Sequence, residues 1–201
     1  MTSLIDDLND ASWISIEAES YDEEVEDEGY LLCIPRQPTL TLQHYIQNRI
    51  WRRIELFNES VDSYLSMSGA SMKPMTTSAL ESLGAFLRTH RSPVAFSVVP
   101  SGGASVALHN TAQSRFIRTK HAVVDARGGQ IEASALPSGW KYERYSLVAT
   151  ADGAIALYSE CDASFVRIDA AEVHARGGPI QRSKLPADWA CARFQVRFSV
   201  V

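Results

Sequence analysis

The chain has 201 residues, of which 45% are hydrophobic and 21% charged, and its net charge is −5. This length corresponds to one large domain or two small ones, and it can form a hydrophobic core without disulfides. No segment reaches the roughly 18 apolar residues of a membrane span, and the acidic beginning is unlike a signal peptide. The three cysteines, Cys33, Cys161 and Cys191, are too scattered for a disulfide framework or a zinc site. We therefore expect a cytoplasmic protein.

Charge is distributed unevenly along the chain. Residues 1–30 contain eleven acids and no Lys or Arg, so residues 31–201 contain the other 13 acids and all 19 bases. A segment with a charge of −11 thus precedes a body with a charge of +6. Such a segment is either a solvated, disordered tail or an arm that binds a basic surface.

Two short stretches favour the binding arm. Ser12–Ala18 and Tyr30–Ile34 have the apolar pattern of short strands, so we assign residues 1–36 to an acidic arm that contacts a protein partner. The residues expected to bind this partner are Asp22, Glu23, Glu24, Glu26, Asp27 and Glu28.

A helical region is predicted over residues 37–92. Apolar residues that recur at spacings of three and four predict an amphipathic helix over 40–65, which faces the core or forms the seam of a homo-oligomer. A second helix is predicted to start at Thr77 or Ser78, because Ser78 and Glu81 form a capping-box pattern, and to end before Pro93.

The C-terminal half matches itself without a gap when it is shifted by 49 residues. The matched segments include Ser105–His109 with Ala154–Tyr158, Ala126–Gly129 with Ala175–Gly178, and Trp140 with Trp189. Each copy is predicted to form short antiparallel strands, the first over 93–150 and the second over 151–201. Two copies are too few for a solenoid, so we expect an α+β fold that ends in a pseudo-twofold pair of β units.

Motifs for catalysis or metal binding are missing from the sequence. Neither a nucleophile elbow nor a paired-histidine metal motif occurs, and the five histidines are scattered. Between the two copies, His174 stands at the position of Asp125, and Tyr158 stands at that of His109. We predict no catalytic residues, no metal site and no cofactor.

Basic residues alternate with aromatic residues in the two β units. Basic strands with aromatic side chains bind single-stranded nucleic acid by stacking and phosphate contact, but solvated strand faces also explain such charges. The residues that would contact nucleic acid are Arg115, Arg118, Lys120, Lys141, Arg144, Arg167 and Arg193.

Residues 64–108 contain a Gly69-Ala70 turn, a predicted helix from Thr77 to Leu87, and the turn Pro100–Gly103 before Val106–Leu108. In these features the segment resembles part of a widespread uncharacterised bacterial family. The tryptophans that this family has near the Gly-Ala turn and after the last strand are missing here. The resemblance implies a bacterial or phage accessory protein and carries no active-site residues.

These observations favour a non-catalytic protein–protein interaction module of the inhibitor, antitoxin or immunity type, whose acidic arm binds a basic partner surface. Two alternatives stay open. One is a nucleic-acid-binding protein whose basic β body is gated by its acidic arm. The other is a structural subunit of a larger phage or bacterial assembly.

Overall fold

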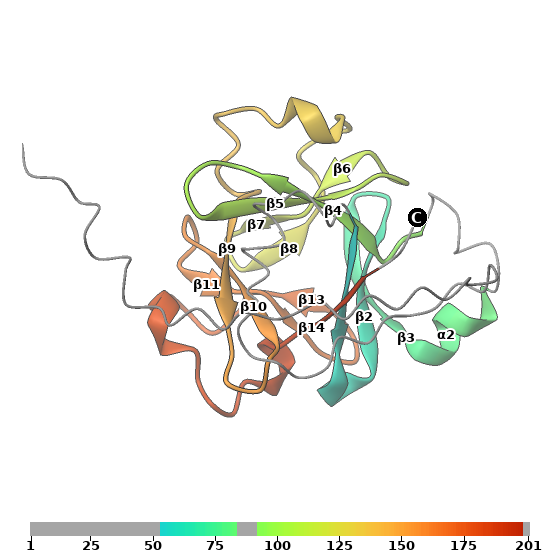
Figure 1. The fold of residues 1–201 in the computed structure, drawn as a ribbon, viewed down its shortest axis with the longest axis vertical. Helices are drawn as coiled ribbons and strands as arrows, with labels where there is room; N and C mark the ends of the chain where they lie inside the picture. Colours follow the sequence, from blue (N-terminus) through green and yellow to red (C-terminus); the bar gives the residue numbers. More distant parts are fainter. Residues whose placement is uncertain (1–52, 84–91, 199–201) are drawn as a thin grey trace, which may run out of the picture.

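The computed structural model describes residues 53–83 and 92–198 (Figure 1). Within these ranges the chain is mainly antiparallel β-sheet with one short α-helix, so the predicted α+β fold with two helices is wrong. The acidic arm and the first part of the predicted helix 40–65 lie outside the described residues.

The strands form three consecutive groups. The first strand group contains β1 (Ile54–Asn58), β2 (Ser63–Ser68), β3 (Ser71–Thr76) and β4 (Ala95–Pro100). The second contains β5 (Ser105–Asn110), β6 (Arg115–Phe116), β7 (Arg118–Lys120), β8 (Val123–Asp125) and β9 (Tyr145–Ala149). The third contains β10 (Ile155–Ser159), β11 (Ser164–Phe165), β12 (Arg167–Ile168), β13 (Val173–His174) and β14 (Gln195–Phe198). Short 3₁₀ turns are η2 (Glu59–Val61), η4 (Ala133–Ala135), η5 (Arg182–Lys184) and η6 (Ala190–Ala192).

The first and last strands of each group build a six-stranded barrel. β14 pairs with β1, β1 with β4, β4 with β5, β5 with β9, and β9 with β10. Two backbone hydrogen bonds of 2.9 and 2.8 Å between Ile155 and Phe194 bridge the remaining gap, from β10 to the residue before β14.

Three hairpins, β2–β3, β7–β8 and β12–β13, complete the sheet. They are joined by bridges from Ser71 to Asp125 and from Val123 to His174. A six-stranded barrel with three joined hairpins is the architecture of a β-trefoil. The symmetry is therefore three-fold, and the predicted pseudo-twofold pair of β units is wrong.

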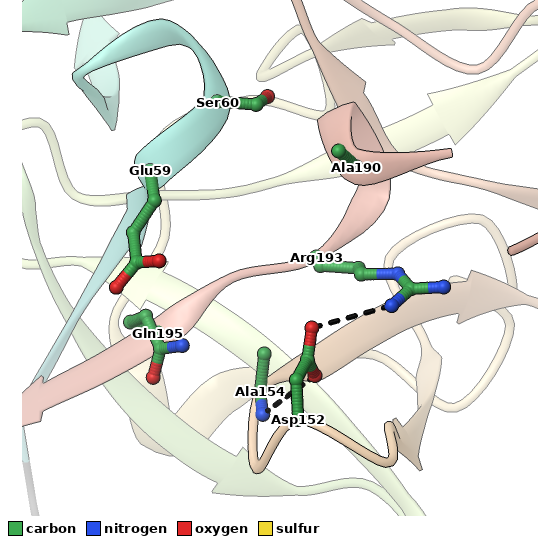
Figure 2. Close-up of a pocket in the computed structure, with 7 residues that line it drawn as sticks. All are labelled: Glu59, Ser60, Asp152, Ala154, Ala190, Arg193 and Gln195. Atoms are coloured by element: carbon green, nitrogen blue, oxygen red, sulfur yellow. Dashed lines mark hydrogen bonds and ion pairs between the residues drawn. The ribbon is translucent and has the colours of Figure 1, made fainter. Parts of the chain in front are cut away.

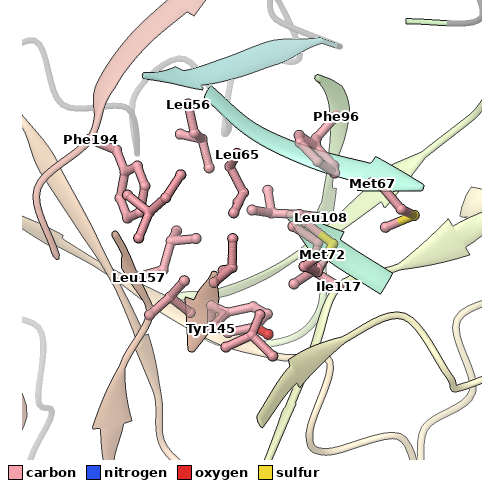
Figure 3. Packing of buried hydrophobic residues seen from close by; sticks show 14 of the residues in the cluster. Leu56, Leu65, Met67, Met72, Phe96, Leu108, Ile117, Tyr145, Leu157 and Phe194 are labelled. Atoms are coloured by element: carbon pink, nitrogen blue, oxygen red, sulfur yellow. The ribbon is translucent and has the colours of Figure 1, made fainter. Parts of the chain in front are cut away.

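The core is built from corresponding positions of the three groups. Leu56, Leu108 and Leu157 come from the first strand of each group, and none of them has exposed surface. They lie in one cluster with residues that precede or begin the last strands, including Tyr145 and Phe194 (Figure 3). Burying each large apolar side chain contributes roughly 1.5–3 kcal/mol, so this shared cluster is the main source of stability.

The segment that starts at Ile54 is a strand, and the burial of its first three residues alternates as in a strand. Ile54 and Leu56 are fully buried on one face, while Glu55 between them is half-buried. Phe57 points to the other face, where its ring lies 4.9 Å from that of Tyr64. The helical spacing from Ile54 to Phe57 and Val61 is thus produced by a strand followed by a turn. This explains why the predicted helix over 40–65 is wrong from Ile54 onward.

A second predicted helix is present in shortened form as α2 (Thr77–Ser82). Its N-cap is Thr76, whose hydroxyl accepts a hydrogen bond of 3.2 Å from the backbone N–H of Ala79. None of its residues is buried, and Leu83, which caps its C-terminus, is 45% exposed. The helix therefore packs on the outside of the first strand group and contributes little to the core.

Buried asparagines connect the strand groups. Asn110 has no exposed surface, and its side-chain amide donates to three backbone carbonyls of segment 92–95 at 3.0–3.2 Å. Asn58, at the corresponding position of the first group, donates to the carbonyls of Ala190 and Arg193 at 2.9 and 2.8 Å. Each asparagine thus joins the first strand of one group to the segment that leads into the last strand of another.

Replacing Asn110 by Ala removes the side-chain donor of these carbonyls, of which only that of Pro93 is also shown to accept from the backbone N–H of Met67. We expect Asn110→Ala to lower the free energy of unfolding by about 2 kcal/mol or more. Chemical denaturation measures this loss. The neighbouring Thr111 is exposed, so Thr111→Ala is the control and changes stability by less than about 0.5 kcal/mol. Equal effects of the two substitutions would contradict the role assigned to Asn110.

Candidate functional site

The seven basic residues nominated for nucleic-acid binding all lie in the second and third strand groups. Of these, Lys120 and Lys141 share one partner, because their ammonium groups lie 5.4 and 5.6 Å from the centre of the Tyr142 ring. Arg115 donates a hydrogen bond of 2.9 Å to the carbonyl of Ala126. The six acids nominated for partner binding lie outside the described residues.

Arg144 and Arg193 hold the two long loops that precede β9 and β14. Arg144 donates to the carbonyl of Ser101 and to three carbonyls of segment 137–140, the latter at 3.0–3.4 Å. Arg193 donates to two carbonyls of segment 186–187 and to the carboxylate of Asp152. The turns η4 and η5 of these loops project from the barrel, at the top and at the left of Figure 1. Much of the donor capacity of both guanidinium groups is therefore used inside the chain.

Arg118 forms a two-pronged ion pair with Asp125 across the hairpin β7–β8. Its Nε and Nη2 atoms lie 2.8 and 2.9 Å from the two carboxylate oxygens. This hydrogen bonding raises the pKa of Arg118. Glu143 is only 4% exposed, and burial raises its pKa, while the positive charge of Arg118 opposes that rise. Arg118 thus has two carboxylates of its own chain nearby.

Arg167 stands 49 residues after Arg118, but its surroundings differ. Its cross-strand neighbour is His174, and its guanidinium carbon lies 4.4 Å from the centre of the Trp189 ring. The Nε atom of Arg167 is buried and has no hydrogen-bond acceptor among the described residues. The position of Glu143 is taken by Ala192.

His174 belongs to a cluster with Asp169 and Glu172, whose potential ligand atoms lie within 4.8 Å of one another. Its Nδ1 accepts a hydrogen bond from the backbone N–H of Arg176, and its Nε2 lies 3.4 Å from the Asp169 carboxylate. Burial, together with the charge of Arg167, lowers the pKa of His174, which favours the neutral ring with its proton on Nε2. The Glu172 carboxylate is bound by the guanidinium of Arg176. These contacts satisfy the three side chains without a cation.

A polar pocket of about 290 Å³ lies between the end of β1 and the segments around β10 and β14 (Figure 2). Its lining residues are Glu59, Ser60, Asp152, Ala154, Ala190, Arg193 and Gln195. The Asp152 carboxylate accepts from Arg193 at 3.2 Å and from the backbone N–H of Ala154 at 3.2 Å, and hydrogen bonding lowers its pKa although burial opposes this. The ion pair thereby forms one wall of the pocket.

His109 and Tyr158 make the same contact in the second and third strand groups. The Nε2 of His109 donates to the carbonyl of Ile131, and the Tyr158 hydroxyl donates to that of Ile180, both at 2.8 Å. The rings of His109 and Phe116 lie 4.8 Å apart, as in the matching pair of the third group, at 4.9 Å. The histidine therefore replaces a tyrosine that holds a loop, and its buried Nδ1 has no partner among the described residues.

This comparison predicts how stability depends on pH. Burial lowers the pKa of His109, so the unfolded chain takes up the proton first as pH falls below about 6.5, and the folded state loses stability. His109→Tyr copies Tyr158 and removes this loss. We expect the variant's stability advantage over the wild type to grow by up to about 1 kcal/mol between about pH 7.5 and about pH 5. Denaturant titrations of both proteins measure it, and a difference that is independent of pH would contradict the assignment.

The contacts of Arg144 predict a loosened loop when its donors are removed. We expect Arg144→Gln to increase the rate of proteolytic cleavage within residues 127–141 severalfold, because the loop carbonyls lose their common donor. Arg127→Gln is the control, since the Arg127 side chain is 71% exposed. Limited proteolysis with mass mapping of the fragments reads out both variants. Equal cleavage of the two would show that Arg144 does not hold the loop.

The strand pairing defines a β-trefoil. Long loops precede two of its barrel strands, and Arg144 and Arg193 hold these loops. No known family pattern matches the chain, and no curated protein sequence matches it. The fold is similar to that of a chain of the cytolethal distending toxin from Actinobacillus actinomycetemcomitans, with a TM-score of 0.53 and 10% identity over 74% of this chain and 90% of that chain. A chain of the Haemophilus ducreyi cytolethal distending toxin has a TM-score of 0.52 and 10% identity over 83% and 89%. At this identity the similarity shows the fold alone.

Sequence reasoning did not find the polar pocket or the contrast between Arg118 and Arg167. The pocket joins residues from the first and third strand groups, and only the closed barrel brings them together. The sequence does indicate this contrast, because the match between the two copies places His174 at the position of Asp125.

Within the described ranges, no helix is long and apolar enough to cross a membrane.

Proposed function

We propose that the chain is a non-catalytic protein-binding module whose acidic arm contacts a basic surface of a partner. The observation that carries this proposal is the charge division, −11 in residues 1–30 against +6 in the remaining chain. Opposite charges on two surfaces steer association and fix the register of a complex. The fold is similar to that of two bacterial toxin chains, which is compatible with a bacterial setting, and we propose an inhibitor, antitoxin or immunity role on the charge division alone.

The contacts of the body support protein binding more than nucleic-acid binding. Arg118, Arg144 and Arg193 make hydrogen bonds within the chain, and a phosphate would have to compete with those bonds. Arginines committed in this way stabilise loops and hairpins and contribute less to a phosphate-binding face.

One observation favours the second candidate, a nucleic-acid-binding body that is gated by the arm. Lys120 and Lys141 both lie against Tyr142, and two ammonium groups beside one aromatic ring are typical of single-strand contacts. On this alternative, the acidic arm competes with phosphates for the basic body.

The test of the main proposal uses the immobilised full-length chain and a variant in which the arm acids at 22–24 and 26–28 are replaced by their amides. A control variant carries the same exchange at the exposed body acids Glu81, Glu132 and Asp188. Proteins retained from a nuclease-treated bacterial lysate at about 0.15 M salt are identified by mass spectrometry.

We expect a basic protein to be retained by the wild type and the control, lost with the arm variant, and released at about 1 M salt. Retention of the same proteins by all three chains would refute the role of the arm. If the arm variant instead gains affinity for labelled single-stranded DNA, and salt weakens that binding steeply, the second candidate replaces the first.

A further inference from the structure

We propose that the third strand group carries a binding site for a carboxylate, formed by Arg167 together with Trp189 and Gly177. This site lies on the described body, so it goes beyond the proposed function and does not depend on the arm having a protein partner.

The second strand group shows the same site with carboxylates already in place. Asp125 accepts two hydrogen bonds from Arg118, at 2.8 and 2.9 Å. Glu143 supplies a second carboxylate, whose Oε1 lies 3.0 Å from the position that a Cβ on Gly128 would occupy. Arg118 is thus provided with anions by its own chain.

The third group has lost both of these acids. His174 replaces Asp125, and Ala192 replaces Glu143. The Arg167 side chain makes no hydrogen bond or ion pair with any described residue, and its Nε is buried without an acceptor. Because an unpaired guanidinium is costly to bury, an oxyanion that binds its remaining N–H groups gains more than it would at a solvated arginine.

The guanidinium lies beside an aromatic ring and an exposed glycine. The guanidinium carbon of Arg167 lies over the Trp189 ring, 4.4 Å from its centre, and its Nη2 lies 3.5 Å from the Cβ position of Gly177, which is exposed. In the second group a carboxylate oxygen lies beside the matching glycine, whereas here a guanidinium nitrogen does. Gly177 itself has no side chain that could cover this nitrogen, and the Trp189 ring lies on the same side of the glycine.

The two neighbouring acids, Asp169 and Glu172, do not form an ion pair with Arg167. One oxygen of the Asp169 carboxylate accepts from the backbone N–H groups of Ala171 and Glu172, and the other faces His174. The Glu172 carboxylate is bound by Arg176. The two Nη groups of Arg167 match a carboxylate in shape, and we assign a carboxylate as the ligand because Arg118 binds one through its Nη2 in the second group.

Two sources can deliver the carboxylate: the acidic arm of this chain, or an acidic side chain of another molecule. The probe is a fluorescein-labelled peptide with the sequence of residues 22–28, and fluorescence anisotropy measures its binding to the full-length wild type and to the arm variant. Binding to the arm variant alone means that the chain's own arm occupies the site. Equal binding to both means that the site is free for an acid from another molecule.

Three substitutions in the arm variant test the site itself. Arg167→Gln removes the guanidinium, and we expect it to weaken peptide binding about tenfold or more. His174→Asp recreates the pair of the second group inside the chain, so it weakens peptide binding to a similar extent without lowering the melting temperature. Arg127→Gln removes one exposed charge at the edge of the second group, and it changes the affinity less than about twofold.

Three results would overturn the proposal: no peptide binding by either chain, equal effects of Arg167→Gln and Arg127→Gln, or unchanged binding by His174→Asp. The last variant keeps Arg167 and its charge, so its result separates a specific site from general attraction to a basic body. Failure here is also distinct from failure of the proposed function, because retention of a protein partner by the arm is measured without any change at Arg167.

Discussion

Leu56, Leu108 and Leu157 enter one buried cluster from three strands that are about 50 residues apart in the chain. None of the three strand groups can bury its leucine alone, because each contributes only two barrel strands and one hairpin. The barrel therefore forms only when all three groups meet, and the buried side chains of Asn58 and Asn110 satisfy the carbonyls where the groups join. This shared burial leaves the loops between strands free to differ without cost to the core.

The positions just outside the core show how far such differences go. The ring pairs Phe57–Tyr64, His109–Phe116 and Tyr158–Phe165 have centroid distances of 4.8–4.9 Å, so the packing is common to all three groups. The polar tips differ. In the first group, Phe57 has no polar atom, and the guanidinium of Arg197 lies 3.9 Å from its ring centre and donates to the Tyr64 hydroxyl instead. Packing is thus preserved while the chemistry at the surface changes from group to group.

The sequence predicts short antiparallel strands in the second and third groups, but helices over most of the first group. The matched segments Ser105–His109 and Ala154–Tyr158 overlap β5 and β10, so the gapless match between the two copies pairs equivalent strands. In the first group, Ile54, Phe57 and Val61 match a helical spacing, although Ile54 and Leu56 are fully buried and Glu55 between them is only half-buried. The missing information is register, since only pairing of β1 with β4 and β14 shows which side chains share a face.

The same limit applies to the candidate site. Arg118 and Arg167 occupy equivalent positions of the two copies, and the sequence pattern predicts phosphate contacts for both. Their cross-strand partners decide what they do: Asp125 fixes one guanidinium within the chain, whereas His174 leaves the other to stack on Trp189. In a fold whose core is repeated three times, loss of an acid in one group does not disturb the barrel, but it exposes a donor that the other group keeps satisfied. Comparing equivalent positions in the three groups of one chain can therefore identify a candidate binding residue such as Arg167, and this comparison needs no related sequence.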